Sequence, residues 1–221
     1  MTDPTLLNAL RELPTAALAD ADKRLRACDP GLRPVNAGVK LVGVARTVRC
    51  HEDFLAVIRA LDVAQPGDVL VVDTCGSRRA VVGELFTMES QRRGLAGLIV
   101  DGPVRDVSML RQLALPVYAR GLCPVSGTIR DLGQLHIPVQ CGGVTVAPGD
   151  IVVADDDGIL VGTAAEFAPL IEKARETERR EALIAARMQS GTSLLSMLNL
   201  AEHVAALERG EPGRLAFNVG D

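Results

Sequence analysis

The chain has 221 residues, and its 24 basic and 28 acidic side chains give a net charge of −4. Aromatic residues make up 2% of the sequence and no segment is strongly basic, so we expect no nucleic-acid partner. Apolar residues make up 48%, which is enough for one aliphatic core. The five cysteines form no CxxC pair, and no apolar run approaches the about 20 residues of a membrane span. These features predict a reduced, cytoplasmic protein without membrane partners.

The predicted elements begin with helices and continue with a β/α pattern. Residues 4–28 have a helical pattern that Pro14 interrupts, and residues 39–48 have the apolar pattern of a strand. The middle of the chain then alternates in the order strand 69–73, helix 79–93, strand 97–100, helix 104–113 and strand 117–119. This alternation is typical of parallel βαβ units.

The last third of the chain changes from strands to helices. Short strand patterns occur at 138–141, 144–146, 151–154 and 159–161. Asp157-Gly158 predicts a tight hairpin, and helices are expected over 164–190 and from a cap at Thr192 to Glu208. We therefore expect an α/β domain over residues 1–191, followed by a C-terminal helix and tail at 192–221.

One short pattern occurs twice. Pro66-Gly67-Asp68 and Pro148-Gly149-Asp150 each precede an apolar run that ends in Asp. The repeat is either a trace of duplication or the same turn chemistry used twice to enter a strand.

The strongest candidate site is Arg105-Asp106, directly after the strand at 97–100. Ligands of open α/β sheets bind beyond the carboxyl ends of the strands, and the N-terminus of the following helix would add N–H groups for an anion. Arg105 could bind a carboxylate, and Asp106 offers oxygen ligands for Mg²⁺ or Mn²⁺. The structural alternative is an acidic first-turn residue beside a surface cation.

Glu84 belongs to the preceding βα unit and would face the same crevice. Its carboxylate could hold a water or relay a proton. The structural alternative is an exposed helical glutamate.

Glu84, followed by twenty residues and Arg105-Asp106, resembles the D-x20-R-D signature of metal-dependent pyruvate aldolases. These enzymes act on 4-hydroxy-4-methyl-2-oxoglutarate and 4-carboxy-4-hydroxy-2-oxoadipate, and they share a fold with the RraA-like regulators of ribonuclease activity. The resemblance covers roughly residues 13–191, and it includes Leu18–Ala21, Gly43–Val48, both Pro-Gly-Asp turns, Gly142–Val144 and Asp155–Gly158.

The resemblance implies a fold and a set of roles. The fold is a mixed β/α core like the swivelling phosphohistidine domain, assembled as a homotrimer or homohexamer with sites between subunits. Asp106 would bind the divalent metal, Arg105 the pyruvyl end of the substrate, and backbone amides the carboxylate. Those amides belong to Gly83, Glu84, Leu85 and Phe86, and a glutamate from a neighbouring subunit's C-terminal helix, Glu181 or alternatively Glu178, would complete the site.

Two positions depart from the family patterns. Glu84 replaces the aldolase Asp, whereas the regulators have Gly there. Met109 stands where the regulators have an acidic residue. The carboxylate at position 84 therefore favours an enzyme over a regulator.

Retro-aldol cleavage needs an electron sink, and the sequence offers two choices. A Schiff base would need a lysine, but Lys23 and Lys173 lie in helical ends and Lys40 is distant in sequence from Arg105. A divalent metal is therefore expected.

These residues predict a metal-dependent lyase that cleaves a 4-hydroxy-2-keto acid, such as 4-hydroxy-4-methyl-2-oxoglutarate, to pyruvate and decarboxylates oxaloacetate. The alternatives are a non-catalytic regulator that binds a ribonuclease or another protein, and a related metal-dependent lyase or hydrolase acting on a different keto acid.

Overall fold

The computed structural model describes residues 3–218, which form two compact units. The N-terminal unit extends to Glu172, and the C-terminal unit begins at Lys173. No helix among the described residues is both long enough and apolar enough to cross a membrane.

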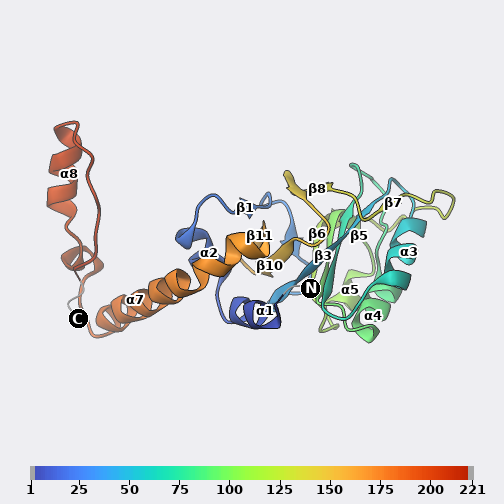
Figure 1. Cartoon of the computed structure of the whole chain (residues 1–221), viewed down its shortest axis with the longest axis horizontal. Helices are drawn as coiled ribbons and strands as arrows, with labels where there is room; N and C mark the ends of the chain where they lie inside the picture. The colour runs from blue at the N-terminus through green and yellow to red at the C-terminus, as the bar shows by residue number, and fades with distance from the viewer. Residues whose placement is uncertain (1–2, 219–221) are drawn as a thin grey trace. The chain divides into compact units, whose positions relative to one another are not determined.

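The N-terminal unit is built on a mixed sheet that curls into a half-barrel (Figure 1). Within residues 3–218 the sheet has nine strands: β1 (Arg26–Ala27), β11 (Gly158–Gly162), β10 (Ile151–Asp155), β3 (Leu41–Arg49), β4 (Asp68–Asp73), β5 (Gly97–Val104), β6 (Val117–Leu122) and β2 (Arg33–Pro34) in spatial order, with β7 (Gln134–Leu135) beside β3. β3 to β6 are mutually parallel, and β1, β2, β7, β10 and β11 pair antiparallel. A separate hairpin joins β8 (Val139–Cys141) to β9 (Val144–Val146).

Helices connect the parallel strands and cover one face of the sheet. α3 (Leu55–Val63), α4 (Glu84–Arg92) and α5 (Val107–Leu110) follow β3, β4 and β5 in turn, and Figure 1 shows them on the same side. Val57 and Leu61 of α3 pack with Leu70 and Leu98 of the sheet in one aliphatic cluster, and a second cluster fills the other face. The remaining helices of this unit are α1 (Pro4–Arg11), α2 (Thr15–Ala21) and α6 (Ala164–Phe167).

The two Pro-Gly-Asp turns have the same construction. In each turn the Asp accepts a hydrogen bond from the amide three residues earlier, at 2.8 Å for Asp68 and 2.9 Å for Asp150. Each Asp also pairs with an arginine, Arg46 at 2.7 Å and Arg26 at 2.8 Å. The turns therefore enter β4 and β10 by the same chemistry, although β4 runs parallel and β10 antiparallel to β3.

Two predicted helices around the crevice are shorter than expected. α4 begins at Glu84 and not at residue 79, because Val81 and Val82 lie outside the helix and are buried in the core. β5 continues through Pro103, which pairs with Gly121 after a register shift, so α5 spans four residues only. The α3 helix is not among the predicted elements.

The C-terminal unit contains most of α7 (Ile171–Gln189) and α8 (Leu200–Glu208). The predicted helix over 164–190 is divided by a 3₁₀ turn at Ala168–Leu170, where Pro169 follows α6. Ser193 and not Thr192 caps the next 3₁₀ turn, so α8 begins later than expected. Within this unit the Arg180 guanidinium lies 5.6 Å from the centre of the Phe217 ring.

Candidate active site

Arg105 and Asp106 leave the carboxyl end of β5, as the sequence predicts. Asp106 has φ 58° and ψ 36°, the left-handed conformation that Asp tolerates better than most residues. Such a conformation costs on the order of 1 kcal/mol and often marks a functional position. Here it turns the Asp106 side chain back toward the start of α4.

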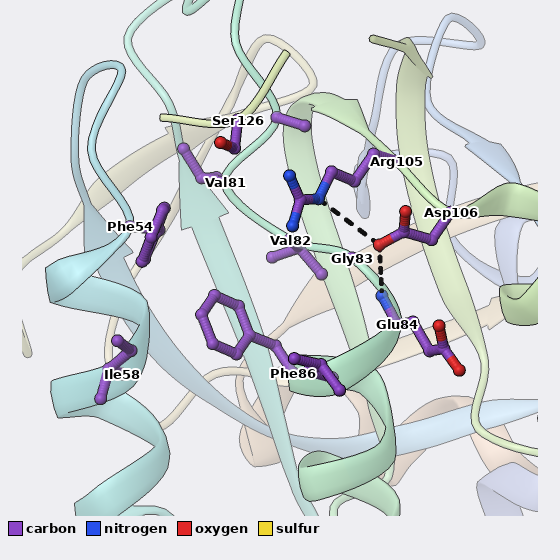
Figure 2. A pocket seen from close by; sticks show the side chains of 12 residues that line it. Phe54, Ile58, Val81, Val82, Gly83, Glu84, Phe86, Arg105, Asp106 and Ser126 are labelled. Carbon is purple, nitrogen blue, oxygen red and sulfur yellow. Dashed lines mark hydrogen bonds and ion pairs between the residues drawn. The ribbon is translucent and has the colours of Figure 1, made fainter. Parts of the chain in front are cut away.

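The Asp106 carboxylate connects its neighbour Arg105 to the first turn of α4. Its Oδ2 atom accepts a hydrogen bond from the Glu84 amide at 3.1 Å and lies 3.4 Å from Arg105 Nε. Figure 2 shows Oδ1 directed away from both donors and the terminal guanidinium nitrogens of Arg105 directed toward the cavity. One carboxylate oxygen is thus fixed, and the other can take a further ligand.

Gly83 makes this close approach possible. A Cβ atom at this position would lie 2.5 Å from Asp106 Oδ2 and 2.9 Å from Arg105 Cγ. Gly83 is also the N-cap of α4, where the first N–H groups have no partner within the helix. Asp106 occupies the Glu84 N–H, and the bare backbone of Gly83 leaves the next N–H groups of α4 beside the Arg-Asp pair, where an anion can bind.

A cavity of about 240 Å³ opens at this junction (Figure 2). Ligand cavities for drug-sized molecules begin at about 300 Å³, so the space suits a small metabolite. The lining residues are Phe54, Ile58, Ala80, Val81, Val82, Gly83, Glu84, Leu85, Phe86, Arg105, Asp106 and Ser126.

The structure brings six of the predicted site residues together in this lining: Gly83, Glu84, Leu85, Phe86, Arg105 and Asp106. The helix N-terminus that faces the cavity is that of α4 and not, as predicted, that of the helix after Arg105, because α5 is a single short turn. Glu178 and Glu181 lie on α7 in the C-terminal unit, Glu181 exposed and Glu178 half-buried. Their part in the site remains a prediction.

The sequence reasoning missed the apolar wall of the cavity. Phe54 and Ile58 come from the start of α3, whose apolar spacing through Leu61 is a helical signal that could have identified it. Val81 and Val82 belong to the irregular segment before Gly83. Ser126 comes from a loop and has no signal in the sequence.

Asp53 fixes the loop that carries Ser126. Its carboxylate accepts hydrogen bonds from the Thr128 hydroxyl at 2.7 Å, the Arg130 amide at 2.6 Å and the Leu55 amide at 2.9 Å. Burial raises the pKa of the Asp53 carboxyl, but these hydrogen bonds outweigh burial and hold the pKa below its ordinary value. Because Leu55 begins α3, one buried carboxylate joins two walls of the cavity.

The donor set suits a metal that keeps much of its water shell. Among the described residues, no group of three or more His, Cys, Asp or Glu side chains is arranged to hold a metal ion. Asp106 and Glu84 are the two carboxylate residues of the cavity lining, and Mg²⁺ commonly binds through one or two carboxylates, waters and substrate oxygens. The residues therefore fit a water-rich Mg²⁺ or Mn²⁺ site and do not fit an all-protein cage.

Comparisons with known proteins agree with this arrangement. A relative from Halalkalibacterium halodurans, named "Putative 4-hydroxy-4-methyl-2-oxoglutarate aldolase", is 34% identical over 174 residues, which cover 78% of this chain and 83% of the relative. A crystal structure from Streptomyces coelicolor, described as an unusual member of the RNase ES inhibitor RraA protein family, is 32% identical with a TM-score of 0.74 and covers 84% of this chain and 97% of its own.

A structure of the RNA-processing inhibitor RraA from Thermus thermophilis is 31% identical with a TM-score of 0.63, and it covers 67% of this chain and 91% of its own. The family model described as RraA-like, Aldolase/RraA, matches residues 15–161, most of the N-terminal unit. These matches confirm the predicted fold class, and the chain belongs to the RraA-like Aldolase/RraA family.

Proposed function

We propose that the protein is a divalent-metal-dependent lyase that cleaves a 4-hydroxy-2-keto acid to pyruvate and decarboxylates oxaloacetate. The observation that carries the proposal is the junction of Arg105 and Asp106 with the N-terminus of α4 beside a small cavity. A guanidinium, a carboxylate and exposed amides are the groups needed to bind a 2-keto acid and stabilise negative charge as it develops.

Each group has a distinct task in this proposal. The amides of Leu85 and Phe86 and the Arg105 guanidinium bind the substrate carboxylate and keto oxygen. Asp106 would hold the metal, and a bound Mg²⁺ or Mn²⁺ would supply Lewis-acid stabilisation. Glu84, the first residue of α4, moves a proton at the substrate's C3 atom through a water.

Assembly completes the site in this proposal. Glu181 of α7, or alternatively Glu178, reaches the cavity of another copy in a homotrimer or homohexamer. The support is the resemblance to aldolases of this family.

The test is pyruvate release from 4-hydroxy-4-methyl-2-oxoglutarate and from oxaloacetate, measured with Mg²⁺ or Mn²⁺ and again with excess EDTA. We expect turnover that chelation abolishes and that Asp106→Ala lowers to background. Turnover that survives both changes would exclude the metal mechanism.

Regulation of RNA processing is the competing function, favoured by the two structural neighbours described as RraA inhibitors. The presence of an acidic residue, Glu84, in the cavity lining favours the lyase instead. A ribonuclease inhibited by the purified protein, together with no turnover of any keto acid, would establish the regulator.

A further inference from the structure

The cavity beside Arg105 has two chemically different ends. Arg105, Asp106, Glu84 and the first amides of α4 form the polar end. Opposite them, five apolar side chains form the other end, with the Phe54 and Phe86 rings 5.6 Å apart; the five are Phe54, Ile58, Val81, Val82 and Phe86 (Figure 2).

The charges of the cavity lining determine which groups a substrate can carry beyond its 2-keto acid end. Among the described residues that line this cavity, Arg105 is the one cation, and it already faces Asp106 at 3.4 Å. Glu84 and Asp106 are anionic, and Ser126 is the one neutral polar side chain of the lining. A second carboxylate directed at the apolar end would lose hydration without gaining a cation.

The amides of α4 determine which cavity the substrate occupies. Leu85 and Phe86 line the cavity of about 240 Å³ and do not line the hollow of about 310 Å³ that Arg105 and Asp106 share with Leu122 and Cys123. A keto acid whose carboxylate binds these amides therefore has the apolar end of the first cavity within reach of its C4 group.

We infer that the preferred substrates of the aldol cleavage carry a single carboxylate and an uncharged apolar group on C4, an inference that rests on the lyase activity proposed above. Cleavage breaks the C3–C4 bond, the C4 hydroxyl proton leaves and C3 gains a proton. The products are pyruvate and an apolar aldehyde or ketone. The apolar end then binds the departing carbonyl compound by hydrophobic contact.

The first experiment compares kcat/KM for 4-hydroxy-2-keto acids with methyl, ethyl or propyl groups on C4 and for the dicarboxylate 4-hydroxy-4-methyl-2-oxoglutarate. We expect kcat/KM to rise about fourfold for each added methylene, with the dicarboxylate below the propyl substrate. A preference for the dicarboxylate would overturn the inference while leaving the lyase intact. Absence of pyruvate from every substrate would instead refute the proposed function.

The second experiment places a cation at the apolar end. Ile58 lies on α3 and is 40% exposed, so Ile58→Arg adds a charge without burying it. The matched control is Val63→Arg, because Val63 is 46% exposed on the same helix and does not line the cavity. We expect Ile58→Arg to raise kcat/KM for the dicarboxylate relative to the propyl substrate by about tenfold, equivalent to about 1.4 kcal/mol. The control should leave the ratio unchanged.

An unchanged ratio in a folded Ile58→Arg variant would show that the C4 group lies elsewhere and would overturn the inference. The obvious other direction passes Val107 and Leu122 to a hollow of about 450 Å³ lined by Arg33, Arg111 and Arg120. Arg111→Ala tests that direction, and a selective loss of dicarboxylate turnover in this variant would likewise contradict an apolar C4 group.

Discussion

Substitution of Gly83 by alanine tests the closest contact of the site. The new Cβ would lie 2.5 Å from Asp106 Oδ2, so the carboxylate would have to retreat by about 0.9 Å to reach the 3.4 Å at which ordinary contact begins. A displacement of about 1 Å in a catalytic group can lower the rate about 100-fold, equivalent to about 2.7 kcal/mol. We expect kcat for pyruvate formation to fall by about this factor.

The same substitution should have a small effect on stability. Replacing Gly by Ala at a helix N-cap costs about 1 kcal/mol, which a folded domain tolerates. Gly121→Ala is the matched control, since a Cβ there would meet nothing within 4 Å. The assay is steady-state pyruvate release, with urea unfolding measured in parallel. If Gly83→Ala keeps kcat within about threefold of the parent protein, then the contact between Asp106 and Gly83 does not position the reaction.

Three further experiments test other parts of the site. Arg105→Lys keeps the charge but loses the planar guanidinium, so we expect kcat/KM to fall about 10- to 100-fold while the circular dichroism spectrum is unchanged. Full activity of this variant would contradict a directed hydrogen-bonding role for Arg105. Asp53→Asn should lower the free energy of unfolding at neutral pH by about 2 kcal/mol. Because the pKa of Asp53 is depressed in the folded protein, the stabilisation by its carboxylate is present above about pH 4 and is lost as the pH falls through the folded pKa. The unfolding free energies of the two proteins should therefore converge in acid, and a difference that persists there would contradict the assignment. Asp106→Asn and Glu181→Gln should each be inactive alone yet regain part of the activity when coexpressed, and failure of complementation would place Glu181 outside the neighbour's site.

The sequence predicted the central parallel strands and one hairpin of the sheet because local patterns carry that information. Apolar runs separated by helical spacing indicated the parallel strands from β4 to β6, and Asp157-Gly158 indicated the hairpin between β10 and β11. The sequence also predicted that Glu84 lies near Arg105 and Asp106, because the carboxyl ends of neighbouring parallel strands lie at the same edge of a sheet.

Other features depend on tertiary contacts that no local pattern carries. Val81 and Val82 are buried in the core outside any helix, so α4 begins only at Glu84. The left-handed conformation of Asp106 follows a register shift in β5 that extends the strand to Val104. Ser126 reaches the cavity because the backbone on either side of it pairs with Ala80, which is distant in the sequence, so no local pattern indicates its place.

Hydrogen exchange at the methyl group of pyruvate tests the central claim most directly, because it needs no knowledge of the natural substrate. Pyruvate is incubated in deuterium oxide with the protein and Mg²⁺ or Mn²⁺, and the methyl signal is followed by proton NMR. We expect loss of that signal faster than the uncatalysed exchange, suppressed by EDTA and by Asp106→Asn. Exchange at the uncatalysed rate with the metal present would contradict enolate formation at the site of Arg105 and Asp106.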